Sequence, residues 1–126
     1  MTTGRERQSR LRELFAAIDA TDTDKFLTFL APSAVFRFGA AAPAQGHAEI
    51  GAAVSGFFTS IAGVRHELTN MISDGKQWVC EGTVTYTRHD GSRISLPFAN
   101  IFEFDGELIS GYRIYIDIGP LYAESS

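Results

Sequence analysis

The spacing of apolar residues changes once along this chain, near residue 62, and that change limits the folds the chain can adopt. Before it, apolar residues recur every three or four positions, as in helices with one buried face. After it they alternate, and turn sequences interrupt the alternation at 73–75, 89–91 and 105–106. Helices followed by four long antiparallel strands predict an α+β fold, with the helices on one face of a curved sheet.

The first half of the chain predicts three helices and one strand. The first helix covers 5–19, and the break after Asp19 offers side-chain oxygens that can cap a short second helix ending before Pro32. A strand follows at 34–38, and a loop rich in Gly, Ala and Pro leads to a third helix that begins near residue 46.

Length and composition narrow the class of protein. The 126 residues, 44% of them hydrophobic, fit one globular domain over 1–126, with 1–7 frayed or disordered and 120–126 as a tail. A net charge of −4 argues against a nucleic-acid partner. A lone cysteine, Cys80, excludes an internal disulfide, and no signal sequence or membrane-length apolar run is visible. We therefore expect a cytoplasmic protein without a membrane partner.

Asn100 interrupts an apolar face. In the strand expected around 93–104, one alternating set is Ile94, Leu96, Phe98, Asn100, Phe102 and Phe104. A buried amide costs free energy unless its donors and acceptors are met. Asn100 could bond to the backbone at a bulge, or it could donate to a carbonyl or enolate oxygen of a ligand in a pocket. Both readings stay open at this point.

His66 and Asp19 are the other polar residues on predicted apolar faces. His66 falls between Val64 and Leu68, so it is either a satisfied core residue or a general base. Asp19 lies at the edge of the first helix's apolar stripe, where it could cap the helix end or orient an inward-pointing histidine.

The remaining chemical signals are weaker. No histidines or carboxylates have the spacing of metal ligands, and no glycine-rich loop between a strand and a helix could hold a phosphate, so no metal or cofactor is expected. His47 and Glu49 stand where they could cap the third helix. His89 adjoins the 90–91 turn and is expected to face solvent, with its role left open.

Three segments carry a resemblance to a known family. They are residues 22–36, residues 46–50, and residues 97–106 with the later 112–117. Together they resemble the SnoaL-like branch of the nuclear transport factor 2-like superfamily. The resemblance implies a cone-shaped, mixed or antiparallel sheet wrapped around three N-terminal helices and enclosing a pocket. Because that superfamily holds several enzymes and also proteins without catalysis, the fold alone leaves the activity open.

Among the enzymes of the superfamily, scytalone dehydratase resembles the chain best. Asp19, His66 and Asn100 match three of its polar residues. Its two carbonyl-polarising tyrosines fall at Ile18 and Phe38, and its second histidine falls loosely near His89. The base and tyrosine of ketosteroid isomerase fall at Phe38 and Leu14. The charged triad of limonene-epoxide hydrolase falls at about Glu81, Thr83 and Ile114.

The resemblance and the residues together favour a cofactor-free lyase, isomerase or cyclase acting on a hydrophobic, polyketide-like or aromatic carbonyl compound. His66 would move the proton, Asp19 would orient His66, and Asn100 would hold the oxyanion. The expected ligand walls are Phe38, Phe98, Phe102, Tyr112 and Ile114. Arg113, Tyr115 and Asp117 would face a partner in a homodimer. A ligand-binding or dimerisation module without turnover is the alternative.

Overall fold

The computed structural model describes residues 4–123, which form four helices and a six-stranded sheet. In chain order the elements are α1 (Gly4–Asp19), α2 (Thr23–Leu27), β1 (Leu30–Phe38), β2 (Ala44–Gln45), α3 (Gly46–Thr59), β3 (Gly63–Ser73), β4 (Gln77–Thr87), β5 (Arg93–Asp105), β6 (Leu108–Tyr115) and α4 (Gly119–Tyr122). The predicted order of helices before long strands is confirmed.

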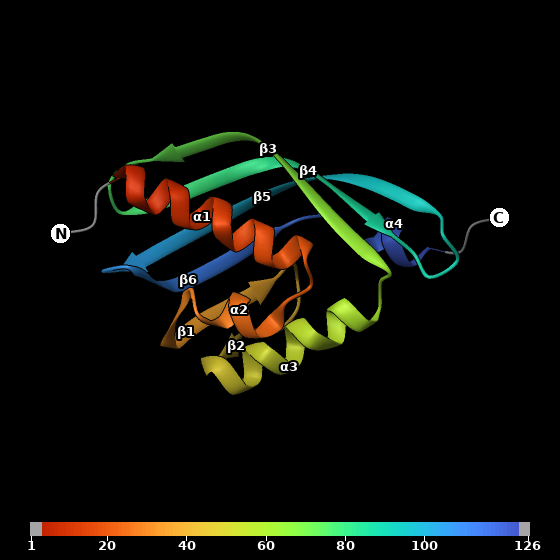
Figure 1. The fold of residues 1–126 in the computed structure, drawn as a ribbon, viewed down its shortest axis with the longest axis horizontal. Helices are drawn as coiled ribbons and strands as arrows, with labels where there is room; N and C mark the ends of the chain where they lie inside the picture. The colour runs from red at the N-terminus through yellow and green to blue at the C-terminus, as the bar shows by residue number, and fades with distance from the viewer. Residues whose placement is uncertain (1–3, 124–126) are drawn as a thin grey trace.

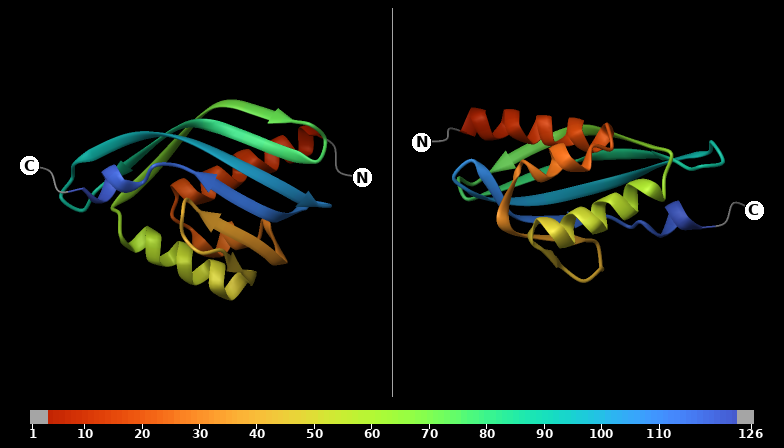
Figure 2. Two further views of the ribbon diagram at one scale, coloured as in Figure 1. Left: turned by 180° about the vertical axis from the view of Figure 1, so that it is seen from behind. Right: turned by 60° about the horizontal axis from the view of Figure 1, so that its bottom comes forward.

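The sheet has the strand order β2-β1-β6-β5-β4-β3. The last four strands pair in sequence as an antiparallel meander, whereas β1 lies parallel to β6, so the sheet is mixed. Figure 1 shows the long strands curving behind α1, and the first view of Figure 2, seen from behind, shows the strands in front of α1. The predicted α+β fold, a curved sheet wrapped around the N-terminal helices, is confirmed.

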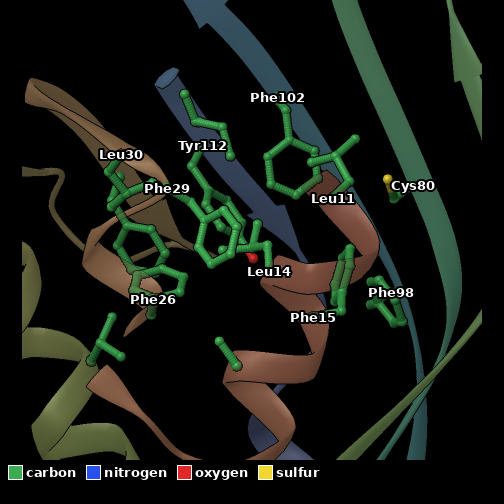
Figure 3. Close-up of a cluster of buried hydrophobic side chains, with 14 of the residues drawn as sticks. Leu11, Leu14, Phe15, Phe26, Phe29, Leu30, Cys80, Phe98, Phe102 and Tyr112 are labelled. Carbon is green, nitrogen blue, oxygen red and sulfur yellow. The ribbon is translucent and has the colours of Figure 1, made fainter. Parts of the chain in front are cut away.

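Alternation on β5 and β6 places the predicted residues in the core. Leu96, Phe98, Asn100 and Phe102 are buried, and Tyr112 faces the same interior from β6. Figure 3 shows Leu11, Leu14 and Phe15 of α1 packed onto these aromatic side chains. The helix thus covers the concave side of the sheet, as its three-and-four spacing predicts.

The prediction of unbroken alternation on β3 was wrong beyond Leu68. The β3–β4 register shifts between Leu68 and Asn70, which inserts one extra residue into β3. A β-bulge of this kind reverses the faces that follow it. Met71 consequently packs against the core, while Ile72 is 59% exposed.

The bounds of β1 also differ from the prediction. The strand begins at Leu30 instead of Ala34, and its pairing with β6 is irregular between Leu30 and Val35. Pro32 falls inside this irregular stretch, where a missing backbone donor does not interrupt the ladder.

A helix lies at each end of the described chain. Residues 4–7 belong to α1, and Arg7 donates to the Gly106 carbonyl while lying over the Phe104 ring. At the other end, α4 forms inside the predicted tail, because Leu121 is buried and Arg88 donates to the carbonyls of Pro120 and Leu121. Residues 1–3 and 124–126 lie outside the described residues.

Candidate active site

The end of α1 sets the position of Asp19. Thr21 has a left-handed φ of 52°, its N–H bonds to the Ile18 carbonyl, and the N–H of Asp22 bonds to the Ala17 carbonyl. This pair of bonds is the Schellman ending of a helix. The ending satisfies the helix carbonyls with backbone donors and leaves the Asp19 side chain free to reach β3.

Asp19 binds His66 through both carboxylate oxygens. Oδ1 lies 2.6 Å from the ring Nδ1, and Oδ2 accepts from the His66 backbone N–H at 3.0 Å. A carboxylate can only accept, so Nδ1 carries the proton. In the neutral ring this arrangement leaves Nε2 as the basic nitrogen, and Nε2 has no hydrogen-bonding partner within residues 4–123. Both side-chain oxygens of Asp19 are therefore bonded to His66 and not to the end of the helix.

Two phenylalanine rings fix the imidazole from its sides. Phe15 of α1 lies 5.0 Å from the His66 ring, and Phe98 of β5 meets it edge-on at 5.1 Å, both measured between ring centroids. The His66 side chain is only 9% exposed, whereas that of Asp19 is 28% exposed. The ring is thus held on several sides, while the carboxylate keeps partial contact with solvent.

His66 lines a cavity of about 240 Å³ between the sheet and the helices. The lining is mostly aromatic and aliphatic: Ile18, Phe26, Phe36, Phe38, Ala41, Ala53, Val54, Phe57, Phe58, Val64, His66, Val84, Tyr86, Phe98, Asn100, Tyr112, Ile114 and Ile116. No Lys, Arg, Asp or Glu is among these residues. The cavity is therefore apolar with a few polar groups, which is the usual make-up of a small-molecule site.

Asn100 lies within this cavity wall at the middle of β5. Its backbone pairs regularly with Cys80 on one side and Ile114 on the other, so no bulge explains it. The residue is 2% exposed, and its Oδ1 has no partner among the described residues. Oδ1 is an acceptor that a ligand donor could satisfy, and no hydrogen bond among the described residues uses the Nδ2 donors, so the amide favours a ligand at this position.

Two tyrosines complete the polar groups of the cavity. Tyr86 of β4 and Tyr112 of β6 both line it. Burial raises the pKa of each hydroxyl above its ordinary value, and for Tyr86 the neighbouring Tyr122 and Asp19 raise the pKa further. Both hydroxyls consequently remain protonated near neutral pH and are available as hydrogen-bond donors.

The structure brings together only part of the predicted site. Asp19 and His66 are in contact, and Asn100 shares the cavity with His66 but is not hydrogen-bonded to it. Phe98 packs against His66 and precedes Asn100 by two residues on the same face of β5, so it lies between the two polar groups. Among the predicted wall residues, Phe38, Phe98, Tyr112 and Ile114 line the cavity.

Phe102 was predicted as a ligand wall, and that prediction was wrong. It is fully buried in the core, where its ring packs on Tyr112 at 4.4 Å between centroids. His89 is exposed, as predicted, and its Nε2 contacts the Thr59 carbonyl outside the cavity. Sequence reasoning missed Tyr86, although the alternation of Val84 and Tyr86 along residues 77–87 carried the signal.

Two general properties follow from the described residues. Within residues 4–123, no group of three or more His, Cys, Asp or Glu side chains could hold a metal ion. In the same part of the chain, no helix has the length and hydrophobicity needed to cross a bilayer.

Several solved structures of other proteins are similar to this architecture. An NTF2-like protein of unknown function from Burkholderia pseudomallei has a TM-score of 0.83 and 22% identity, covering 91% of this chain and 93% of that one. TerC, co-crystallized with polyporic acid, has a TM-score of 0.81 and 18% identity, with coverage of 92% and 95%. A LEH-like epoxide hydrolase of M. tuberculosis has a TM-score of 0.77 and 17% identity, with coverage of 91% and 85%. No curated protein matches the chain.

A curved six-stranded sheet with helices over it and an apolar cavity between them defines a protein of the nuclear transport factor 2-like fold. A family model narrows the class further, because the SnoaL-like domain model matches residues 11–112. The chain belongs to the SnoaL-like domain family.

Proposed function

We propose that this protein is a cofactor-free lyase, isomerase or cyclase that moves a proton on a hydrophobic carbonyl compound. The observation that carries the proposal is the contact of 2.6 Å between Asp19 and a histidine that lines the cavity. A carboxylate on Nδ1 fixes the tautomer and orientation of the ring, and it stabilises the imidazolium that forms when Nε2 takes a proton.

The proposed step moves one proton and one electron pair. His66 Nε2 removes a proton from the carbon next to the substrate carbonyl, and the electron pair of that C–H bond moves to the carbonyl oxygen. Asn100 donates a hydrogen bond to this oxygen as negative charge develops on it. The electron pair then returns from the oxygen. In an isomerisation it forms a C–H bond at another carbon with the proton from His66, and in a dehydration it expels the hydroxyl group of the neighbouring carbon, which leaves as water with that proton.

The walls of the cavity support a flat, apolar substrate. Phe38, Phe57 and Phe98 offer ring faces or edges to a ligand. The Asp19 carboxylate lies outside the lining and is already bonded to His66. Two structural neighbours are consistent with organic ligands in this fold, namely TerC with polyporic acid and the LEH-like epoxide hydrolase. At identities below 25% they lend support to the fold of the pocket and not to a particular substrate.

The competing function is a ligand-binding module without turnover. In that case His66 and Asn100 would satisfy each other or a bound molecule. Within the described residues, however, no hydrogen bond joins them, and His66 is instead bound by Asp19 at the cavity wall. This arrangement favours the catalytic alternative.

Two measurements on one ketone test the proposed function. Thermal shift with 1-tetralone reports binding, and deuterium incorporation next to its carbonyl in D2O, followed by NMR, reports proton transfer. We expect wild type to do both, His66→Gln to lose exchange by about two to four orders of magnitude, and Asn100→Ala by about two to three. Binding without exchange above the buffer rate would support the ligand-binding module instead.

We also propose that the protein forms a homodimer through the outer face of the sheet, around Arg113, Tyr115 and Asp117. Tyr115 is 54% exposed there, beside an Arg113–Glu103 ion pair of 2.8 Å. An exposed aromatic residue next to satisfied charges suits a two-fold contact between identical surfaces.

A further inference from the structure

The phenol of Tyr112 is a polar group of the cavity to which the proposed step assigns no role. The residue is 1% exposed and lines the cavity, yet its hydroxyl makes no hydrogen bond to any residue between 4 and 123. Buried tyrosine hydroxyls usually have a partner. An unbonded hydroxyl at a cavity wall therefore points to an acceptor that a ligand would bring.

The ring of Tyr112 is firmly held, so the hydroxyl has a defined position. Its centroid lies 4.4 Å from that of Phe102, 5.1 Å from that of Phe36 and 5.9 Å from that of Phe26. Figure 3 shows Tyr112 among core side chains that include Phe26 and Phe102, with its hydroxyl oxygen in red. A donor fixed in this way costs little conformational entropy when it binds.

Tyr112 and Asn100 line the same cavity from two neighbouring strands, β6 and β5. Asn100 lies on β5 directly opposite Cys80, and its side chain faces the same cavity.

The register of the strands agrees with this proximity. Asn100 pairs with Ile114 and Phe102 pairs with Tyr112, so Asn100 and Tyr112 are diagonal neighbours on one face. Side chains at diagonal positions lie about 7–8 Å apart at their Cβ atoms, within reach of a long aromatic side chain. Two donors, one amide and one phenol, can thus converge on a single oxygen.

The lining also selects against charge in the ligand. It contains no Lys or Arg that could pair with a carboxylate or phosphate, and the Asp19 carboxylate behind His66 would repel an anion. An unpaired charge in such a cavity carries a large desolvation cost. The volume of about 240 Å³ lies below the range of about 300–1,000 Å³ that is typical for drug-sized ligands, which favours one or two rings.

Building on the proton-transfer function proposed above, we infer that Tyr112 is the second hydrogen-bond donor to the substrate oxygen that Asn100 binds, and that the substrate is an uncharged ketone of one or two rings. Tyr112 is then a catalytic residue that contacts the developing oxyanion. The two donors divide the cavity into an oxygen-binding end and the basic end formed by His66.

Binding of three related probes tests this inference without relying on turnover. The probes are 1-tetralone, tetralin, which lacks the oxygen, and the anion 1-naphthoate. They are titrated into wild type, Tyr112→Phe and the control Tyr122→Phe, whose hydroxyl contacts Ser60 away from the cavity. We expect Tyr112→Phe to weaken 1-tetralone binding about three- to tenfold and to leave tetralin binding within about twofold, because one hydrogen bond is lost. Tyr122→Phe should change neither, and 1-naphthoate should bind at least tenfold more weakly than 1-tetralone.

The inference is overturned if Tyr112→Phe binds 1-tetralone as wild type does, if wild type does not bind 1-tetralone, or if 1-naphthoate binds equally well. Tetralin binding reports that the cavity of the variant is intact, so a misfolded variant is recognised. If the oxygen-dependent loss occurs but wild type shows no deuterium exchange, the proton-transfer function fails while the role of Tyr112 in binding stands.

Discussion

Asp19 holds His66 through two different groups of the same residue, the ring nitrogen and the backbone N–H. The two bonds tie the last residue of α1 to β3, so the carboxylate supports both the fold and the proposed base. Its partial exposure lowers the cost of burying the charge. A single residue therefore links the stability of the cone to the chemistry of the cavity.

Replacing Asp19 by Asn should separate these two roles. Asp19→Asn keeps the shape but removes the charge, so we expect a loss of about 10²-fold in deuterium exchange and about 1–3 kcal/mol in the free energy of unfolding. The matched control is Asp22→Asn, because Asp22 caps α2 through the Lys25 N–H and Asn caps equally well. Equal exchange rates in Asp19→Asn and wild type would rule out an orienting role.

The thiol of Cys80 is shielded from solvent in the folded protein. The residue is fully buried, and burial raises the pKa of its thiol to about 12. The thiolate, which is the reactive form, is therefore scarce and shielded in the folded protein. We expect no reaction with a thiol-specific disulfide reagent at pH 8 until guanidinium unfolds the chain, and one equivalent afterwards. Rapid labelling of the native protein would show that β4 opens locally.

Asp19, His66 and Asn100 could be singled out from the sequence because each interrupts an apolar pattern. Sequence alone could not decide between capping and orienting for Asp19, because that choice depends on the left-handed Thr21 that ends α1. The sequence also could not show that Tyr112 lines the cavity while Phe102 lies in the core, because strand alternation predicts that both side chains face inward. Which of two inward residues reaches a cavity depends on the neighbouring strands.

Among the elements, β3 carries a bulge close to the proposed base. The register shift follows Leu68, two residues beyond His66, and Leu68 pairs with Gly82 of β4. A Cβ on Gly82 would lie 1.9 Å from the Glu67 carbonyl oxygen, a contact that the backbone cannot relieve cheaply. Close backbone approach at a bulge is a common reason for glycine within a strand. The alternation of residues gave no sign of the bulge, which is why Met71 and not Ile72 packs against the core.

Gly82→Ala should be strongly destabilising for that reason. We expect a loss of about 3 kcal/mol or more in the free energy of unfolding, measured by urea denaturation. The control is Gly56→Ala on α3, where an added Cβ meets nothing within 4 Å. In a helix this change should stabilise by up to about 1 kcal/mol. Similar effects of the two substitutions would contradict the close packing of β3 on β4.

At the scale of the whole molecule, the cavity and the proposed dimer surface lie on opposite faces of one sheet. Beyond the β5–β6 register shift, Tyr115 at the end of β6 is exposed on the outer face, while Tyr112 and Ile114 line the cavity. A substitution on the outer face should therefore change association without removing any cavity residue. The order of helices and strands predicted this division, because strand alternation places the two sets on opposite sides.

Tyr115→Asp tests the dimer. If the outer face is the interface, wild type should have twice the chain mass of 13.8 kDa by light scattering, and the variant should have the mass of one chain. Tyr122→Asp, on the exposed surface of α4, serves as the control and should leave the mass unchanged. A wild-type protein with the mass of a single chain would contradict the proposed interface.

The protonation state of the neutral His66 ring decides whether His66 can act as the proposed base, and ¹⁵N NMR of histidine-labelled protein measures it. We expect a protonated Nδ1 bonded to Asp19, an unprotonated Nε2 whose signal shifts when 1-tetralone is added, and loss of this pattern in Asp19→Asn. A proton on Nε2, or an Nε2 signal that ignores the ketone, would contradict a base that faces the cavity.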